Sequence, residues 1–363
     1  MEISYGFVTT DEERRDVYRF RYEIYIEKMG FNYECDHENK LLHDNGATPI
    51  LLFARLDDKV IGTATLHLGS EVEANSEESI TYGLDRFLSV ADGKDSIFLT
   101  RLITDEEYKK EGVAMALLNL VFDFLLKKEI KLIFLDCRPH LLNLYKSLGF
   151  RTYKETFNDQ YAGILIPMVL DVQNANYLKA IKSPFSKFFE DVSPEDSSES
   201  IDLDELFPEA NQVLTLTKGD TDVWAQFHDR KVLKVFDGFS ESEKEELLNR
   251  TSLINCKTGD LLINKGGPDN TMFIIIEGSV DISVKGAVVA TETKGGIVGE
   301  ISFLLHTTRS ATVTVNSNDT KILAIRQRAL DQLIESESKL ASRFLYNLNR
   351  IIAAKLAAVG GLF

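Results

Sequence analysis

The stretch GEISFLLHTTRSATVTV, residues 299–315, constrains the fold of this chain more than any other. It places a Gly-Glu pair ahead of an Arg-Ser-Ala-Thr segment, with an apolar run between them and a β-rich run after them. Such a pair predicts a turn that opens a short helix, whose free N–H groups suit an anion. Arg309 can bind a phosphate through two parallel hydrogen bonds, and Glu300 can accept a hydrogen bond from a sugar hydroxyl. The stretch therefore predicts a site for a phosphate joined to a ribose.

This stretch closely resembles the phosphate-binding cassette of cyclic nucleotide-binding domains, the family of the bacterial cAMP receptor protein and the regulatory subunits of cAMP-dependent kinase. Two further segments support the resemblance. KTGDLLINKGGPD (257–269) is similar to the family's glycine-punctuated first strands, and MFIIIEG (272–278) is similar to its next strand and turn. The resemblance covers roughly residues 239–359, which is a whole domain.

The resemblance implies a role for each residue of the cassette. Glu300 should bind the ribose 2′-hydroxyl, and Arg309 should pair with the cyclic phosphate. Four neighbours should supply backbone or hydroxyl contacts and close packing: Gly299, Ile301, Ser310 and Ala311. A serine after the arginine occurs in cAMP binders, although a hydroxyl there can also favour guanine, so we expect cAMP and keep cGMP as the alternative. A domain that keeps the fold without the ligand is the competing interpretation, and the presence of both Glu300 and Arg309 favours binding.

Length and charge limit the remaining possibilities. A chain of 363 residues is long for one core, so two domains joined by a linker are expected. The formal net charge of −16 argues against wide contact with nucleic acid or anionic membranes. Cys35, Cys137 and Cys256 lie far apart, which suits a reducing compartment and gives no metal or disulfide framework. The polar start and the lack of any run of ~18 apolar residues predict a cytoplasmic protein without a membrane span.

Residues 1–172 alternate between helical and strand patterns, which predicts a mixed α/β (or α+β) domain. Helices are expected at 11–29, 112–127 and 139–148, the last of them stopped by Gly149. Strands are expected at 50–56, 60–68, 96–103, 131–137 and 161–172, with a hairpin turn at 57–59.

Residues 173–238 are expected to join the two domains as an acidic linker and a short irregular segment. Within them, 190–209 hold nine acidic residues and no basic one, which is typical of a flexible or loosely helical linker, with an acidic interaction tail as the alternative. Short β-like runs occur at 213–216 and 232–236, and the only tryptophan is Trp224. The sequence does not place these residues in a fold.

Residues 239–363 form the expected second domain. Ser240 and the glutamates after it predict a capped helix through Leu248. Short strands separated by glycine turns are expected at 261–263, 272–276, 280–284, 288–291 and 310–315, which is typical of a small β-barrel or jelly roll. One or two amphipathic helices are expected over 329–359, where Phe344, Leu348 and Ile351 are spaced to pair as a homodimer helix. The chain stops soon after them, so no DNA-binding helix-turn-helix is expected.

A second group of motifs lies in the first domain. The segment KKEGVA (109–114) follows a predicted strand and opens an apolar helix. Its small residues let the backbone approach a pyrophosphate, which the helix N-terminus and nearby lysines stabilise. The segment fits the Q/R-x-x-G-x-G/A loop of GCN5-related N-acetyltransferases, with lysine in place of glutamine or arginine, and LYKSLGF (144–150) resembles the family's FYxxLGF segment. A plain helix start behind two lysines is the competing interpretation.

The acetyltransferase resemblance implies which residues bind acyl-CoA and act on it. Leu102 and Ile103 should offer main-chain hydrogen bonds to the pantetheine arm. Tyr145 should protonate the departing thiolate as general acid, with a packed helix aromatic as its alternative role. The pyrophosphate loop should contribute five residues: Lys109, Lys110, Gly112, Val113 and Ala114. The general base stays open among water, His37, Asp44 and His140.

The first helix carries a finer resemblance, to acyl-homoserine lactone synthases and long-chain N-acyl amino acid synthases. Four positions match residues of those synthases: Arg21, Tyr25, Phe31 and, after the central strand, Arg101. Two positions differ, because Phe98 stands where they carry a glutamate and Thr65 where they carry an arginine. The resemblance therefore implies an N-acyltransferase with a thioester donor rather than lactone synthesis, with the acceptor and the acyl length open.

Together the two resemblances imply a bacterial N-acyltransferase whose activity is set by cyclic nucleotide binding. The donor is expected to be acyl-CoA or an acyl-carrier protein thioester, and the acceptor a small-molecule amine or a protein lysine. No nucleic acid partner and no metal are expected. The alternative is a non-catalytic nucleotide sensor with a degenerate acyltransferase fold, which would bind no acyl-CoA.

Overall fold

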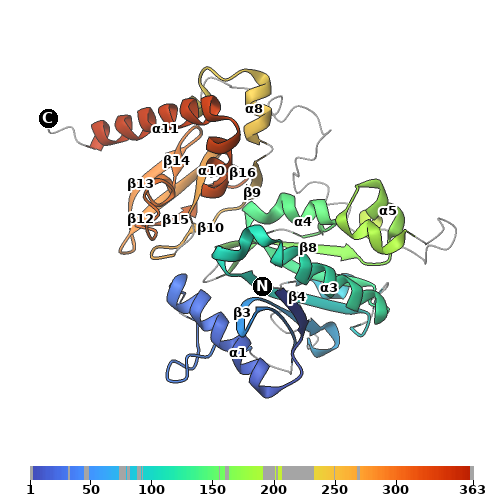
Figure 1. Cartoon of the computed structure of the whole chain (residues 1–363). Helices are drawn as coiled ribbons and strands as arrows, with labels where there is room; N and C mark the ends of the chain where they lie inside the picture. Colours follow the sequence, from blue (N-terminus) through green and yellow to red (C-terminus); the bar gives the residue numbers. More distant parts are fainter. Residues whose placement is uncertain are drawn as a thin grey trace. The chain divides into compact units, whose positions relative to one another are not determined.

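The computed structural model of the chain describes residues 3–31, 33–44, 49–72, 79, 82–87, 91, 93–154, 156–159, 163–190, 201, 203–206, 233–248, 250–267 and 270–359. The chain divides into two compact units (Figure 1). The first unit comprises Met1–Cys137, Leu141–Phe157 and Leu165–Gln212, and the second comprises Arg138–His140, Asn158–Ile164 and Val213–Phe363.

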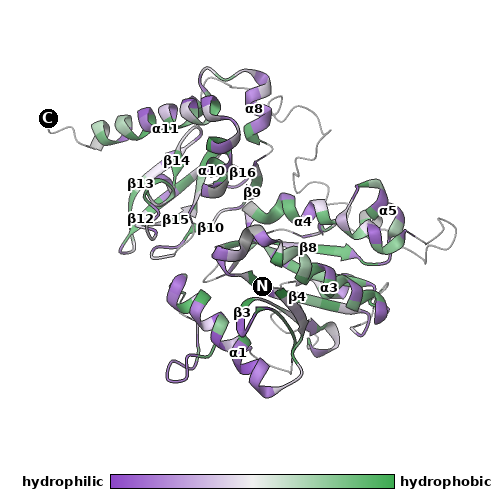
Figure 2. Ribbon diagram, in the orientation of Figure 1, coloured by the Kyte–Doolittle hydropathy of each residue, from purple (hydrophilic) through white to green (hydrophobic). Residues whose placement is uncertain are grey.

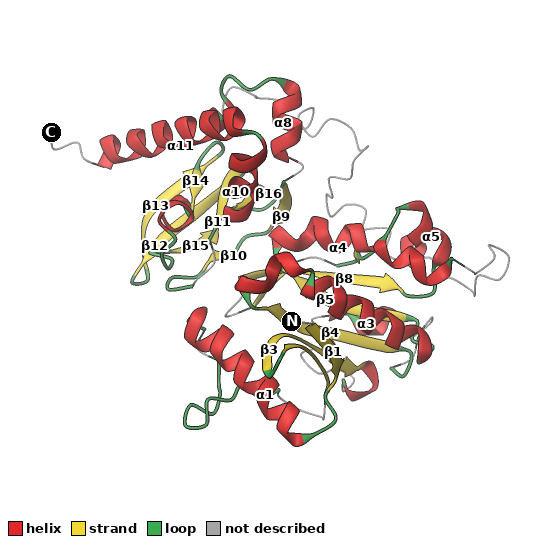
Figure 3. Cartoon of the chain, viewed as in Figure 1, coloured by secondary structure: helices red, strands yellow, loops and turns green. Residues whose placement is uncertain are grey.

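Among the described residues, eight strands form one sheet in the order β1-β2-β3-β4-β5-β8-β6, with β7 paired to β8; all of it belongs to the first unit except Asn158–Asp159 of β7 and Gly163–Ile164 of β8. The strands are β1 (Ile3–Phe7), β2 (Ile50–Leu56), β3 (Lys59–Leu68), β4 (Ser96–Thr104), β5 (Leu132–Cys137), β6 (Arg151–Thr152), β7 (Phe157–Asp159) and β8 (Gly163–Asp171). The pair β4·β5 is parallel, whereas β1·β2, β2·β3, β3·β4, β5·β8 and β6·β8 are antiparallel. The sheet is therefore mixed, which confirms the predicted fold class of this domain (Figure 3). The sequence missed the short strands β1, β6 and β7.

The helices of the first unit pack on both faces of this sheet. They are α1 (Asp11–Arg21) with a π-helix at Tyr22–Lys28, α3 (Val113–Lys127), α4 (Leu142–Leu148), α5 (Ala175–Ala180) and α6 (Leu203–Leu206). Short 3₁₀ turns lie at Gly69–Glu71, Leu84–Phe87, Glu106–Glu111, Pro139–Leu141 and Pro184–Phe189. The helices predicted at 112–127 and 139–148 are confirmed, and Gly149, with φ of 113°, ends the second of them.

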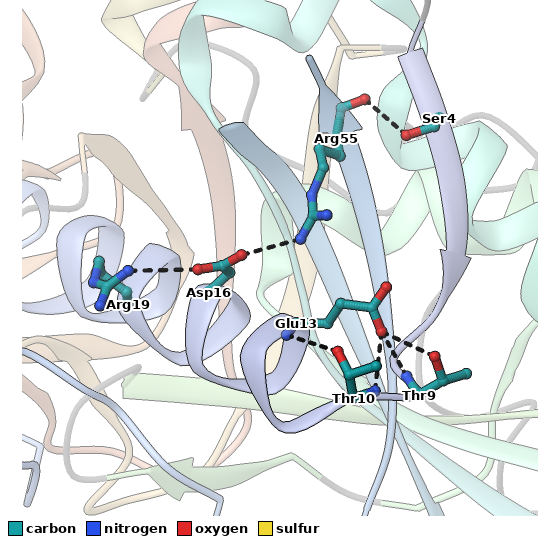
Figure 4. Close-up of polar contacts among 7 residues, drawn as sticks. All are labelled: Ser4, Thr9, Thr10, Glu13, Asp16, Arg19 and Arg55. Carbon is teal, nitrogen blue, oxygen red and sulfur yellow. Dashed lines mark hydrogen bonds and ion pairs between the residues drawn. The ribbon is translucent and has the colours of Figure 1, made fainter. Parts of the chain in front are cut away.

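The start of α1 shows why this segment becomes a helix. The Glu13 N–H donates to Thr10 Oγ1 at 3.2 Å, and the Thr10 N–H donates to Glu13 Oε2 at 3.1 Å (Figure 4). This reciprocal pair satisfies two N–H groups that have no partner inside the helix. One turn further on, Asp16 accepts from Arg55 Nη2 at 3.1 Å, which fastens α1 to β2.

The two faces of β3 carry different helices. A Cβ atom at Gly62 would lie 2.9 Å from Val113 Cγ1, so β3 and α3 approach too closely there for a larger side chain. Thr63 and Thr65 alternate with Gly62 and face the other way, toward Arg21 of α1. α3 therefore covers one face of the sheet and α1 the other, as can be followed in Figure 1.

The second unit contains two four-stranded antiparallel sheets, ordered β10-β15-β12-β13 and β14-β11-β16-β9 in the described residues. The strands are β9 (Thr251–Cys256), β10 (Leu261–Ile263), β11 (Thr271–Glu277), β12 (Ser279–Val284), β13 (Ala287–Thr293), β14 (Ile297–Val298), β15 (Thr312–Val315) and β16 (Thr320–Arg326). Apolar residues of both sheets, among them Phe273, Ile275, Val313 and Ile322, form a core between them. This architecture confirms the predicted β-barrel or jelly roll.

Helices pack on the outer side of the sheet that contains β11 and β16. They are α8 (Glu241–Leu248), α9 (Glu300–Leu305), α10 (Gln327–Ser336) and α11 (Ser338–Val359), with a 3₁₀ turn at Lys234–Phe236. The β-like run at 232–236, which the sequence did not place in a fold, contributes this 3₁₀ turn in the residues that the structure describes. Asn347 of α11 donates to the carbonyl oxygens of Val235 (3.1 Å) and Asp237 (2.9 Å), so this turn is fastened to a helix rather than to a sheet.

Helix α11 is amphipathic, with hydrophobic and hydrophilic residues interleaved along it (Figure 2). Phe344 and Leu348, which are spaced to pair in a homodimer, are 0% exposed inside the core of their own domain. Tyr346 and Leu356 lie on the helix surface, 65% and 68% exposed. A homodimer through α11 stays a prediction, and it would have to use residues other than Phe344 and Leu348.

Several sequence-based expectations fall outside the described residues. They include the β-like run at 213–216, Trp224 and most of the acidic segment 190–209. Where the structure describes the chain, no helix is long and apolar enough to cross a membrane. The same residues contain no cluster of three or more His, Cys, Asp or Glu side chains arranged to hold a metal ion.

Candidate functional sites

A buried ionic cluster lies between α1 and the sheet. Arg21 Nη1 is 2.7 Å from Asp44 Oδ2, and Arg101 Nε is 3.0 Å from Asp44 Oδ1. The side chains of Arg21 and Asp44 are 0% and 3% exposed, and that of Arg101 is 22% exposed. Burial lowers the pKa of Arg21, while the Asp44 carboxylate opposes that shift. Two guanidinium groups and one carboxylate leave a surplus of positive charge at this site.

The hydroxyl groups of β3 complete the surroundings of Arg21. Its Nη2 atom donates to Thr63 Oγ1 at 3.4 Å and to Thr65 Oγ1. Thr65 is the residue that replaces the arginine of the related synthases, and here its hydroxyl serves to hold another arginine. The cluster thus brings together three residues singled out from the sequence: Arg21, Arg101 and the base candidate Asp44.

The helix that carries Arg21 changes its winding beside this cluster. The sequence predicts one α-helix from Asp11 to Met29, but α1 ends at Arg21 and a π-helix spans Tyr22–Lys28. In this wider winding the Met29 N–H reaches Ile24 O at 2.9 Å, five residues back rather than four. The continuous α-helix is therefore corrected, and π-helical turns are frequent at functional sites.

Three aromatic rings gather at the C-terminal part of the π-helix, where Tyr25 lies within it and Phe31 and Tyr33 follow it. Tyr25 and Phe31 stack with ring centroids 6.1 Å apart, and Phe31 meets Tyr33 edge-on at 5.5 Å. The Arg101 guanidinium lies 5.7 Å from the Tyr33 ring centroid. The arginines and aromatics that match the synthases are thus brought into one neighbourhood, and Tyr33 is an addition that the sequence did not reveal.

Strand β4 carries a β-bulge at this neighbourhood. Thr65 of β3 faces Thr100 of β4. Two residues earlier on β3, Thr63 faces Ile103, which lies three residues later on β4. The extra residue falls near Arg101, whose φ of 50° is left-handed. The bulge therefore changes the direction of the β4 backbone next to the ionic cluster.

The other edge of β4 separates from β5. Their parallel pairing joins Ser96–Phe98 to Leu132–Phe134, and no described residue of β4 beyond Phe98 pairs with β5. An unpaired edge offers main-chain groups to a ligand. Leu102 and Ile103, expected to bond the pantetheine arm, lie on this part of β4.

The predicted pyrophosphate loop leads into α3. Gly112 is the N-cap of α3 with φ of 72°, a left-handed conformation that glycine adopts without strain. Val113 is 1% exposed and belongs to the core, so only its main chain can face a ligand, and Ala114 follows in the first helical turn. Lys109 and Lys110 lie in the 3₁₀ turn Glu106–Glu111, and their side chains lie outside what the structure describes.

Tyr145 lies on α4 and is 7% exposed. Burial raises the pKa of its hydroxyl, with further contributions from Cys137, Asp136 and Tyr25. The phenol is therefore protonated at neutral pH and can donate a proton, although a raised pKa makes it a weaker acid than one matched to the working pH. Because Tyr25 acts electrostatically on both Tyr145 and Arg21, it links the predicted acid to the ionic cluster.

The predicted base candidates differ in their surroundings. His37 Nδ1 lies 3.1 Å from the Tyr22 hydroxyl. Both carboxylate oxygens of Asp44 lie beside guanidinium groups, and the His140 side chain is not among those described. His67 on β3 was not among the predicted base candidates, and the alternation of that strand places it on the face of Thr63 and Thr65.

The phosphate-binding cassette is organised around Arg309, which is 4% exposed. Its Nη1 donates to Ser302 Oγ at 2.6 Å and to Gly299 O at 3.2 Å, and its Nη2 donates to Thr271 O. Gly299 has φ of 81° at the N-cap of α9, and a Cβ there would lie 2.6 Å from Arg309 Nη1. A glycine is therefore required for the guanidinium to sit under this turn.

The predicted ribose ligand Glu300 opens α9, and its side chain is 13% exposed. Lys355 of α11 approaches Glu300 Oε1 at 3.4 Å and Glu292 Oε1 at 2.8 Å, and it also donates to Ile297 O. The remaining predicted contacts line the same turn and loop: Ile301 (51% exposed), Ser310 (exposed) and Ala311 (partly buried). The structure thus brings the predicted cassette residues together at one turn and loop, and Lys355 joins them from a distant helix.

A cavity of about 680 Å³ lies beside the cassette rather than within it. It is lined by the turn at 292–296, by Lys234 and Asp237, and by one side of α11 that includes Arg350 and Lys355. None of the predicted nucleotide contacts lines it. Lys355 is therefore the link between this cavity and Glu300.

Two protein-family models match the chain. One, described as N-acyl amino acid synthase FeeM, matches residues 16–171, and the other, a cyclic nucleotide-binding domain, matches residues 253–337. The chain joins these two kinds of domain. The first match contains the ionic cluster and Tyr145, and the second contains the whole cassette, so both resemblances inferred from the sequence are confirmed.

Individual proteins resemble parts of the chain. The cGMP-dependent protein kinase egl-4 of Caenorhabditis elegans is 28% identical over 109 residues, which are 28% of this chain and 14% of the kinase. A solved cyclic nucleotide-binding domain from Methylobacillus flagellatus has 24% identity and a TM-score of 0.34, covering 36% of this chain and 80% of that one. TofI, solved with an inhibitor and MTA, has 11% identity and a TM-score of 0.39, covering 51% of this chain and 99% of that one.

Proposed function

We propose that this protein is a cyclic nucleotide-regulated N-acyltransferase, which transfers an acyl group from a thioester to an amine. The observation that carries the proposal is the cluster of Arg21, Asp44 and Arg101 beside the open edge of β4. The same chain keeps Glu300 and Arg309 in an assembled cassette. One domain thus supplies a transfer site and the other a control site.

The open edge of β4 supports acyl-CoA or an acyl-carrier protein as the donor. The pantetheine arm carries amide groups, which pair with free main-chain groups in the manner of an added strand. Gly112 gives the chain a left-handed turn at the start of α3, where backbone N–H groups favour an anion such as a pyrophosphate. The edge of β4 would bind the pantetheine arm of the donor, and the start of α3 would bind its pyrophosphate.

The positive charge of the ionic cluster supports an acceptor that bears a carboxylate. Arg101 is the more exposed of the two arginines, and a guanidinium group binds a carboxylate through two parallel hydrogen bonds. An amino acid carries this carboxylate beside its amine, in keeping with the N-acyl amino acid synthase family that residues 16–171 match. A protein lysine, the other acceptor considered, has no carboxylate next to its amine.

Regulation requires that the nucleotide bind one conformation of the protein more tightly than another. Arg309 and Glu300 supply the donor and acceptor groups for the phosphate and ribose of cAMP or cGMP. Lys355 connects Glu300 to α11, so a change at the ribose position acts directly on this helix.

The decisive experiment measures thiol release by the purified full chain. Short- and long-chain acyl-CoA are combined with free amino acids or with a lysine peptide, with and without saturating cAMP or cGMP. We expect amine-dependent release with a free amino acid, changed about 5- to 150-fold by one nucleotide. Equal rates with and without both nucleotides would contradict regulation. Calorimetry that detects a cyclic nucleotide but no acyl-CoA would establish the sensor alternative instead.

Replacing Tyr145 by phenylalanine should lower the turnover number about 10- to 100-fold while acyl-CoA binding is retained. The loss is moderate because a thiol, with a pKa of about 8.5, is a tolerable leaving group even without a proton donor. Steady-state kinetics and calorimetry give the two readings. Tyr153→Phe is the matched control, because Tyr153 is also buried but its hydroxyl donates to Tyr82 O at 2.9 Å. Equal losses in both variants would make Tyr145 a packing residue.

A further inference from the structure

We propose that His67 on β3 is the general base that takes a proton from the acceptor amine. The related synthases carry a glutamate where this chain has Phe98, so the carboxylate expected at that position is missing. This role presupposes the acyl transfer proposed above, and it fills the position for which the sequence offered only water, His37, Asp44 or His140.

The register of the sheet places His67 beside Phe98, the residue that stands where the related synthases carry a glutamate. His67 is directly opposite Phe98 in the antiparallel β3·β4 ladder. Side chains of opposed residues point to the same face, with Cβ atoms about 4.5–5.5 Å apart. Phe98 is also the last residue of β4 that pairs with β5 among those described, so His67 stands where the two strands begin to separate.

The same face of β3 borders the ionic cluster. Thr63, Thr65 and His67 alternate along the strand and share one face. Arg21 donates to the hydroxyls of both threonines, which fixes that face as the one toward α1. His67 therefore lies on the same face of β3 as the two threonines that hold the buried Arg21, next to Thr65.

The surroundings of His67 favour the neutral imidazole, because burial lowers its pKa. Burial is the main cause that lowers its pKa below the ordinary value. Asp44 and Glu71 raise this pKa, whereas Arg101 and Arg21 lower it. The imidazole is partly exposed and makes no hydrogen bond to another described residue, so a ring nitrogen is available to accept a proton.

The acceptor and the base fit one arrangement. A carboxylate bound by Arg101 places the neighbouring ammonium group of an amino acid beside the cluster, within the neighbourhood of His67. The ammonium passes one proton to an imidazole nitrogen, and His67 later releases it to solvent. The free amine then forms a C–N bond to the thioester carbonyl as the C–S bond breaks. Tyr145 gives its proton to the departing thiolate, and the second proton lost by the nitrogen returns through solvent to the Tyr145 phenolate, so the step is balanced.

The test compares His67→Gln with the wild-type protein across pH in the thiol-release assay, from about pH 5 to about pH 9. For wild-type protein, kcat/KM should fall as the pH drops through a pKa below about 6.5, because a protonated imidazole cannot accept another proton. His67→Gln should lose this fall and be slowed about 100-fold at neutral pH. The defect should shrink as the pH rises, because the acceptor amine then loses its proton without help.

His37→Gln is the matched control, because His37 is a described histidine that the sequence, unlike His67, did offer as a base, and it should keep the wild-type profile. Acyl-CoA binding measured by calorimetry should be equal in all three proteins, which separates a lost base from a lost fold. A wild-type rate and pH profile in His67→Gln would overturn the role of His67 while leaving the acyl transfer intact. So would a loss of the same size at every pH. No acylated product from wild-type protein would instead contradict the transfer function itself.

Discussion

Replacing Arg309 by alanine is expected to weaken cyclic nucleotide binding by about 2–5 kcal/mol, roughly 30- to 5,000-fold in Kd. Arg309 is 4% exposed, so its charge acts on a bound phosphate with little screening by water. The variant should also lose the response of the acyl-transfer rate to nucleotide, because no differential binding would remain. Calorimetry with cAMP and cGMP measures the first effect, and the thiol-release assay measures the second.

Two further variants separate phosphate binding from local packing. Arg309 also donates to Ser302, Gly299 and Thr271, so Arg309→Lys, which keeps a charge without the planar fork, should bind nucleotide with intermediate affinity. Arg250→Ala should leave binding unchanged, because Arg250 pairs with Glu246 on the same domain at 2.6 Å, away from the cassette. Full nucleotide response in Arg309→Ala would show that the cassette is not the nucleotide site.

Replacing Asp44 by alanine is expected to destabilise the first domain by about 3–5 kcal/mol. The substitution leaves Arg21, which is 0% exposed, without the carboxylate at 2.7 Å, and an uncompensated buried charge is costly. The midpoint of thermal unfolding should fall by about 6–20 °C for a domain of this size. Scanning calorimetry measures the midpoint, and hydrogen exchange of β3 and β4 shows whether the loss is local.

Asp123→Ala is the control for a salt bridge at the surface. Asp123 pairs with Lys127 one helical turn away at 2.6 Å, with the side chains 39% and 72% exposed. Such pairs contribute about 0.3–0.5 kcal/mol, so this variant should unfold close to the wild-type temperature. Equal stability of Asp44→Ala and Asp123→Ala would mean that Arg21 is solvated in solution and that the ionic cluster is not preformed.

Local signals explain what the sequence could predict. The helix at 112–127 was predicted from its apolar periodicity, and the turn at Gly299 from its glycine. Both signals depend only on residues near in the chain, and Gly112 and Gly299 do adopt left-handed φ angles of 72° and 81°. The capping box of Thr10 and Glu13 is equally local, because its two residues lie three positions apart, but it was not among the predictions. The π-helix at Tyr22–Lys28 was not predictable, because its side-chain pattern reads as an ordinary amphipathic helix.

The sequence by itself determined the two kinds of domain, the order of most elements, and the identities of Glu300, Arg309, Arg21 and Arg101 as candidates. Only the tertiary structure decided which of these side chains meet. Asp44 joins Arg21 across 23 residues, and His67 meets Phe98 through the register of two strands. Strand register is set by non-local pairing, and a shift of one residue would turn His67 to the opposite face. For that reason the candidate base became visible only in the folded sheet.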